Sequence, residues 1–260
     1  GSVVPWLSLR IADANGNTLA AGEPGEIVVS EREAGALFAG YYRNPEATLE
    51  TMTADGWFCT GDAGYLDEDG HLKIIDRAKD VGKLSDGSLF APKYLENKLK
   101  FFSYIKEVVA FGAGQPEVCA FINIDLEAVG NWAERRGLAY AGYADLAARD
   151  EVYDLIADCV KQVNHDLSKD KRLAQSQISR FLILHKELDP DDDELTRTRK
   201  VRRGFVAQKY AVLVEALYAG LERQYIDTEV KFEDGRSGRI SADLKIHPVP
   251  LVAPNLAKAA

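Results

Sequence analysis

The sequence is poor in cysteine and has no long apolar run. Its 260 residues contain 3 Cys and 1 Met. Cys59, Cys119 and Cys159 are too few and too scattered for a disulfide framework or a structural zinc site, which favours reduced thiols in a cytoplasmic protein. No apolar run reaches the ~20 residues that cross a bilayer, and the N-terminus lacks the pattern of a signal peptide. Peripheral attachment to a membrane stays open.

A surplus of basic charge is also missing. Lys and Arg number 32 against 41 Asp and Glu, which gives a net charge of −9. An acidic chain disfavours non-specific binding to nucleic acid, so no nucleic-acid partner is predicted. With 46% hydrophobic and 28% charged residues, the composition is that of a globular protein of one or two domains.

Several catalytic and metal-binding patterns are absent as well. The chain has no Gly-x-Ser-x-Gly nucleophile elbow and no evident Ser/His/Asp set. Its four histidines show no ligand spacing. The acidic turn at residues 67–70 is reminiscent of an EF-hand, but Tyr65 would occupy the first ligand position, which excludes calcium. We therefore predict no metal-binding residues.

Period-two alternation and turn residues predict β-structure in the first part of the chain. Strands are expected at residues 7–11, 26–30 and 57–60, the last ending in a turn at Gly61 and Asp62. A hairpin should follow, with strands at 64–66 and 71–75.

Helical periodicity and further strands follow. Pro92 opens one expected helix, Asp150 is expected to cap a second that runs to Leu167, and a third covers 206–218. Strands are predicted at 108–111, 118–124 and 181–184, an acidic loop at 189–194, and a last hairpin at 229–246 with its turn at 233–236. This order predicts an α+β fold with a β-rich subdomain followed by a smaller mixed α/β domain.

Four positions between residues 62 and 87 are suited to contacting a ligand. Ionised Asp62 offers two acceptor oxygens for vicinal hydroxyls such as those of a ribose, although a turn aspartate could simply bind its own backbone. Arg77 presents a planar fork of donors, and Lys79 lies two residues on; both could equally be solvated charges at a strand end. Gly87 permits a positive φ and close approach of a ligand, or is merely a turn residue.

A basic run, LTRTRKVRR, occupies residues 195–203 directly after an acidic stretch. Such a run is typical of a solvated loop or a nucleic-acid patch. The neighbouring acids argue against the nucleic-acid reading.

The order of these signals along the chain resembles the adenylate-forming superfamily, which includes acyl-CoA synthetases, peptide-synthetase adenylation domains and luciferases. Residues 56–80 carry the resemblance with GWFCTGDAGYLDEDGHLKIIDRAKD, supported by GEI at 25–27 and GYYRNP at 40–45. The sequences at 92–99, 122–125, 131–164 and 195–203 are similar to the long-chain acyl-CoA synthetase branch. The resemblance covers essentially residues 1–246.

The resemblance implies an activity and a role for each candidate residue. The family forms an acyl-adenylate from a fatty acid and Mg-ATP and then transfers the acyl group to coenzyme A. Asp62 and Arg77 would bind the nucleotide, Lys79 would be the hinge between domains, and Gly87 would lie in the loop facing the coenzyme A tunnel. Lys200 would be the catalytic lysine that reaches the acyl carboxylate and the α-phosphate. ATP, AMP, Mg²⁺ and coenzyme A are the implied cofactors and co-substrates.

Two departures from the family pattern concern the last motif. Arg199 stands where many members have glycine, and Arg197 stands where proline is common. Because of these departures, Arg199 and Arg202 are alternative candidates for the role of Lys200. The family's phosphate loop also does not occur in these 260 residues. The chain is therefore predicted to be the C-terminal portion of a longer synthetase, inactive alone.

The predicted segments are a β-rich subdomain at 1–76, a small domain at 77–220 and an extension at 221–260. Without the large N-terminal domain, residues 1–76 should expose an apolar face, which allows a homodimer. Two alternatives stay open, namely a ligase that loads a carrier protein and a non-catalytic binding module of the same fold.

Overall fold

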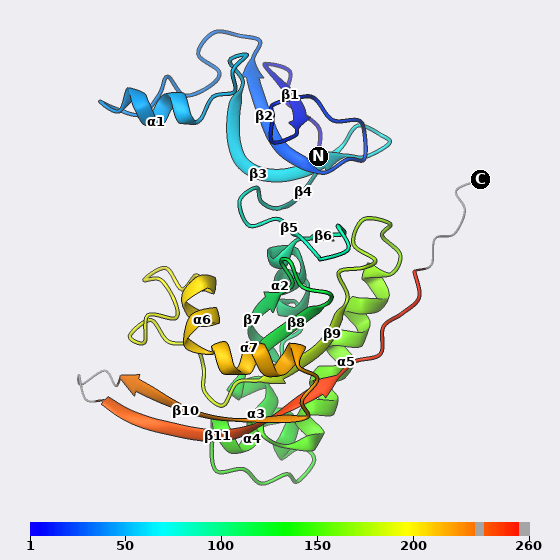
Figure 1. Cartoon of the computed structure of the whole chain (residues 1–260), viewed down its shortest axis with the longest axis vertical. Helices are drawn as coiled ribbons and strands as arrows, with labels where there is room; N and C mark the ends of the chain where they lie inside the picture. The colour runs from blue at the N-terminus through cyan, green and yellow to red at the C-terminus, as the bar shows by residue number, and fades with distance from the viewer. Residues whose placement is uncertain (232–236, 255–260) are drawn as a thin grey trace. The chain divides into compact units, whose positions relative to one another are not determined.

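A computed structural model describes residues 1–231 and 237–254 of the chain. They form two compact units, Gly1–Val81 and Gly82–Ala260 (Figure 1). Both contain β-sheet, and the second is also rich in helix, which confirms the predicted α+β class. Among the described residues, no helix combines the length and apolarity needed to cross a bilayer.

The first unit is an antiparallel four-stranded meander, β1-β2-β3-β4. Its strands bury apolar side chains, among them Ile11, Ile27 and Ile75. Its elements are β1 (Leu7–Ala12), β2 (Gly25–Glu31), the short helix α1 (Pro45–Glu50), β3 (Phe58–Leu66) and β4 (Leu72–Arg77).

The predicted turn at Gly61 and Asp62 is wrong, because β3 continues through both residues. Gly61 adopts a φ of +74°, which glycine reaches without a steric penalty. The pairing with β4 shifts register between Ala63 and Gly64, as at a β-bulge. The turn-like residues thus bend the strand without ending it.

The second unit contains a five-stranded sheet in the order β10-β11-β9-β8-β7. Only β8 and β9 pair in parallel, so a long crossover through α3, α4 and α5 joins them. The elements are β5 (Gly82–Lys83), β6 (Leu89–Phe90), α2 (Pro92–Lys100), β7 (Ile105–Phe111), β8 (Val118–Ile124), α3 (Leu126–Glu134), α4 (Tyr143–Ala147), α5 (Asp150–Leu167), β9 (Ile178–Ile183), α6 (Arg203–Lys209), α7 (Ala211–Tyr218), β10 (Arg223–Lys231) and β11 (Ser237–Pro248).

Helices cover the central strands of this sheet, and every residue of β8 is buried. Phe121 on β8 packs with Tyr210 and Leu213, next to α6 and α7, and Figure 1 shows α7 lying over the sheet. Phe181 on β9 stacks instead on Tyr153 of α5, with ring centroids 5.8 Å apart. Burial on both sides explains why β8 is an apolar run interrupted only by Asn123.

Two helix predictions in this unit are wrong. Asp150 does not cap α5, since Arg149 occupies the N-cap and the Asp150 carboxylate pairs with Lys245 at 2.6 Å. The single helix expected at 206–218 is two helices, interrupted at Tyr210 (φ −107°, ψ 27°).

The C-terminal hairpin is confirmed as β10 paired with β11, and it joins the sheet through β9. Its predicted turn at 233–236 lies outside the described residues.

Candidate functional site

Asp62 and Arg77 are brought together on neighbouring strands. They are directly opposite in the β3–β4 pairing, and Arg77 Nη1 donates to Asp62 Oδ1 at 2.7 Å. This hydrogen bond and the carboxylate charge raise the pKa of the Arg77 guanidinium above its usual range. Both side chains remain accessible, which leaves Asp62 Oδ2 and the rest of the guanidinium available to a ligand.

The backbone beside this pair is fixed by three hydrogen bonds. Gly61 N donates to Glu26 Oε1 at 3.2 Å, and Ala78 N donates to Gly61 O at 2.8 Å. Arg77 N donates to Oδ1 of the buried Asp76. Both ends of the Asp62–Arg77 pair are therefore held by the sheet and its following turn.

Lys79 and Gly87 lie in exposed turns. Lys79 follows β4 in a turn where Asp80 N and Val81 N both donate to Arg77 O. Gly87 sits between β5 and β6 with a φ of +88°, and a Cβ added there would meet nothing within 4 Å. The turn thus has a backbone exposed to solvent and favours glycine because of its left-handed conformation.

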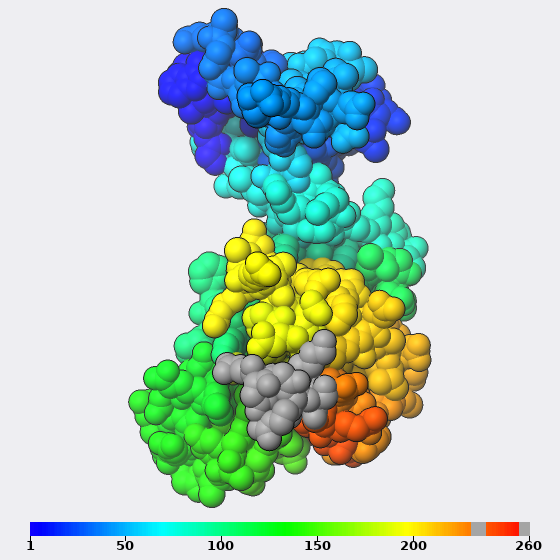
Figure 2. All heavy atoms as spheres, turned by 90° about the vertical axis from the view of Figure 1, so that its left-hand side faces the viewer, coloured from blue at the N-terminus to red at the C-terminus, as the bar shows by residue number. Residues whose placement is uncertain are grey.

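Lys200 lies in a tight hairpin rather than an open loop. Thr196 N donates to Lys200 O at 2.8 Å, and Lys200 N donates to Thr196 Oγ1 at 3.0 Å. Arg199 takes a φ of +57°, unusual for a residue with a side chain, and completes the reversal. In Figure 2 the yellow segment around residue 200 lies on the surface of the second unit.

The basic residues of this run differ in their partners. Arg202 pairs with Asp193 at 2.6 Å, while Arg203 pairs with the buried Glu96 at 2.6 Å and donates to Ala110 O. Lys200 is exposed, and within residues 1–231 and 237–254 its ammonium has no ion-pair partner. The geometry thus favours Lys200 over Arg202 as a cation available to a substrate.

A buried charge cluster at the base of the hairpin was missed by the sequence reading. The Glu194 carboxylate is fully buried, and Lys186 and Lys209 approach it at 2.7 and 2.8 Å. Burial, reinforced by Glu194, raises the pKa of the Tyr210 phenol, so its hydroxyl stays protonated and donates to Glu194 at 2.6 Å. As the last acid of the predicted acidic loop at 189–194, Glu194 gives no sign in the sequence of being buried.

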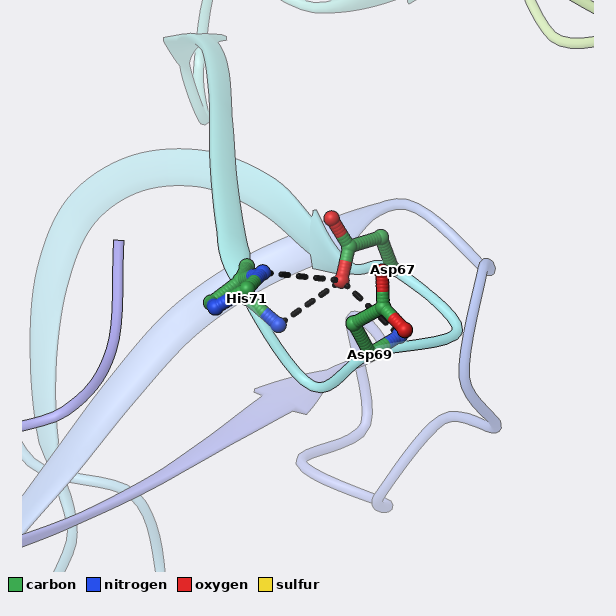
Figure 3. A group of neighbouring side chains, drawn as sticks. All are labelled: Asp67, Asp69 and His71. Atoms are coloured by element: carbon green, nitrogen blue, oxygen red, sulfur yellow. Dashed lines mark hydrogen bonds and ion pairs between the residues drawn. The ribbon is translucent and has the colours of Figure 1, made fainter.

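Asp67, Asp69 and His71 place their ligand atoms within 4.8 Å of one another, in the acidic turn for which the sequence predicts no metal binding (Figure 3). Asp67 Oδ1 accepts from Asp69 N at 3.2 Å and from His71 N at 2.8 Å. The His71 N–H holds the pKa of the Asp67 carboxyl below its usual range. These contacts are those of an aspartate that stabilises its own turn.

The buried thiols are poorly suited to nucleophilic catalysis. Burial raises the pKa of Cys119 to about 12 and that of Cys159 to about 11. Both therefore remain protonated at neutral pH, and the thiolate is the reactive form.

Comparison with known proteins confirms the resemblance. The sequence model of the AMP-binding enzyme C-terminal domain matches residues 79–222. The long-chain-fatty-acid–CoA ligase FadD15 of Mycobacterium tuberculosis is 40% identical over 84% of this chain and 33% of its own length. Long chain acyl-CoA synthetase 1 of Arabidopsis thaliana is 30% identical over 84% of this chain and 32% of its own. The chain thus spans about a third of the length of these relatives and resembles part of fatty acyl-CoA ligases.

A solved structure supports the fold alone. The adenylation domain of a carboxylate reductase from Mycobacterium chelonae matches with a TM-score of 0.59 at 24% identity, over 82% of this chain and 31% of that one.

Proposed function

This chain belongs to the family of AMP-binding enzyme C-terminal domains, and from that premise we propose that it is the C-terminal portion of a longer, AMP-forming long-chain fatty acyl-CoA ligase. The observation that carries the proposal is the 40% identity to FadD15 over most of the chain. The Asp62–Arg77 pair and the unpaired Lys200 supply groups that suit the chemistry of such an enzyme.

In the first half-reaction the fatty-acid carboxylate attacks the α-phosphorus of ATP, forming an acyl-phosphate bond and releasing pyrophosphate. Asp62 Oδ2 would accept from the ribose hydroxyls, while Arg77 holds Asp62 Oδ1 and contacts the same nucleotide. The Lys200 ammonium would stabilise negative charge developing between the carboxylate and the α-phosphate.

In the second half-reaction the thiol of coenzyme A attacks the acyl carbonyl, loses its proton and releases AMP. The exposed backbone at Gly87 suits a loop along which the pantetheine arm could pass. Lys79, in the turn directly after β4, would act as the hinge that exchanges the two catalytic states. In this proposal, 1–76 belongs to the large domain, 77–220 is the small domain and 221–260 is an extension.

Mg²⁺ would enter bound to the triphosphate. It prefers near-octahedral oxygen ligands, whereas the pair described here offers one carboxylate already engaged by an arginine. We therefore assign no residue of this chain to the metal.

The first unit exposes several large apolar side chains, among them Tyr42 at 85% and Ile74 at 63%. Where exposed apolar side chains form a contiguous patch, the patch usually marks an interface. We propose that the missing large domain covers it, with a second copy of the chain as the alternative occupant.

The test is release of AMP and pyrophosphate by the longer ligase when it is given fatty acid, ATP and coenzyme A. Positioning of reactants supplies ~7–11 kcal/mol of such barriers, so this chain alone should show no activity above a heat-killed control. A carrier protein accepted in place of coenzyme A would favour the carrier-loading alternative. No turnover with either acceptor would favour a binding module.

A further inference from the structure

Glu194 receives three hydrogen bonds and a further ion pair although its carboxylate is fully buried. Lys186 Nζ and Asp189 N donate to Oε2 at 2.7 and 2.9 Å. Tyr210 OH donates to Oε1 at 2.6 Å, and Lys209 Nζ forms an ion pair with the same oxygen at 2.8 Å. A buried carboxylate with this many donors is fixed in one place, because moving it would leave charges and backbone groups unpaired.

The backbone of the same residue begins the hairpin that carries Lys200. Glu194 O accepts from Arg202 N at 2.9 Å, so these two residues close the base of the hairpin. Leu195 and Val201 form the next pair toward the tip, and Thr196 and Lys200 form the pair after it. Lys200 is therefore two pairs away from the best-anchored position of the loop.

The charges around Glu194 balance. Lys186 and Lys209 also approach the second buried acid, Asp192, at 2.8 and 3.4 Å. Two acids face two lysines, which leaves no surplus charge to attract a ligand. The cluster is thus suited to holding the loop rather than to binding a substrate.

We propose that Glu194 is a positioning residue, which acts through the hairpin to hold Lys200 in register for adenylation. This inference rests on the proposed role of Lys200. Glu194 does not touch the reacting atoms. Without its anchor, the hairpin would shift, and a displacement of ~1 Å at a catalytic group can reduce the rate about 100-fold.

The test measures both half-reactions in the longer ligase. Glu194→Gln keeps the side-chain shape but removes the charge that pairs with two lysines, and Tyr210→Phe removes one hydrogen bond to Glu194. Glu107→Gln is the matched control, since Glu107 on β7 pairs with Lys100 of α2 and, in the described part of the chain, forms no hydrogen bond or ion pair with the hairpin. Glu194→Gln should slow acyl-adenylate formation by about tenfold or more, with the KM for ATP little changed.

The same variant should convert supplied acyl-adenylate to acyl-CoA at the wild-type rate. Tyr210→Phe should show a smaller loss with the same split, and Glu107→Gln neither loss. An equal loss of rate in both half-reactions would show that Glu194 has only a structural role and would overturn the proposal. A folded Glu194→Gln variant that forms acyl-adenylate at the wild-type rate would also overturn it. If Glu194→Gln does not fold, Tyr210→Phe decides between these results.

Amide hydrogen exchange on the 260-residue chain separates the anchor from the role of Lys200. In Glu194→Gln, the amides of Thr196, Lys200 and Arg202 should lose protection relative to wild type and to Glu107→Gln. Unchanged protection of these amides would contradict the proposal that Glu194 holds the hairpin in place. If Lys200→Ala leaves adenylation intact, the proposed function of Lys200 fails instead, and the exchange result alone decides whether Glu194 holds the hairpin.

Discussion

At the scale of single residues, the site depends on which charges have partners. The sequence shows Lys200 and Arg202 as equivalent members of a basic run, whereas the structure pairs Arg202 with Asp193 and leaves Lys200 exposed. Asp62 and Arg77 were singled out by the chemistry of their side chains, and the structure brings the two into direct contact. Glu194 was missed because its partners, Lys186 and Tyr210, are brought to it only by tertiary folding.

His185 gives a residue-scale prediction about pH. It is buried, and neither ring nitrogen has a hydrogen-bond partner in the described part of the chain. Burial and the nearby Lys186 lower its pKa from 6.5 to about 4. The other charged or titratable groups acting on it or lining the same cavity are Glu194, Lys209, Tyr153, Arg223, Asp243 and Lys245.

The direction of the pH effect on the free energy of unfolding follows from proton uptake by the unfolded chain. Below pH 6.5 the unfolded chain protonates His185 while the folded chain does not, so the free energy of unfolding falls as the pH falls from about 6.5 to about 4. Between pH 7 and pH 5, wild type should lose about 2 kcal/mol more than His185→Phe in urea unfolding. Parallel losses in the two proteins would mean that His185 is already charged in the folded state.

At the scale of elements, alternation and helical periodicity predicted most strands and the long helix α5, because these patterns report which face is buried. They failed where a tertiary contact overrides local preference. Tyr210 leaves the helical conformation and binds Glu194, and Asp150 pairs with Lys245 instead of capping α5. The β3 strand absorbs Gly61 as a bend because pairing with β4 continues beyond it.

Tyr153 joins three elements of the second unit, which gives a prediction about stability. From α5 its hydroxyl donates to Lys245 O on β11 at 2.7 Å and accepts from Ile183 N on β9 at 3.2 Å. Tyr153→Phe should cost about 1–3 kcal/mol, since a buried N–H loses its partner. Asp150→Asn, which breaks the exposed ion pair to the same Lys245, should cost less. Chemical denaturation of both variants gives the comparison, and a larger loss for Asp150→Asn would contradict it.

At the scale of the whole molecule, the chain divides after Val81, within the turn region that carries Lys79. The β-rich first unit and the mixed second unit follow from the patterns in the sequence. The prediction that they are pieces of a larger enzyme came from the family resemblance and the absent phosphate loop, since periodicity carries no information about other domains.

A hinge at Lys79 predicts unequal effects on the two half-reactions. Proline fixes φ near −65° and restricts the preceding residue, so Lys79→Pro should slow thioester formation more than adenylation in the longer ligase. Lys79→Ala keeps the backbone freedom and should leave both steps near wild type. Stopped-flow measurement of each step compares the two rates. Equal losses in both steps for Lys79→Pro would contradict the hinge and indicate that Lys79 is only a charged surface residue.

The most direct test of the account is the rate of each half-reaction in Lys200→Ala of the longer ligase. The account predicts that acyl-adenylate formation falls by ~10²–10³, because a positioned cation is lost where charge develops. Conversion of supplied acyl-adenylate to acyl-CoA should stay near the wild-type rate. Intact adenylation in Lys200→Ala, with the same split produced by Arg199→Ala or Arg202→Ala, would contradict the assignment of Lys200.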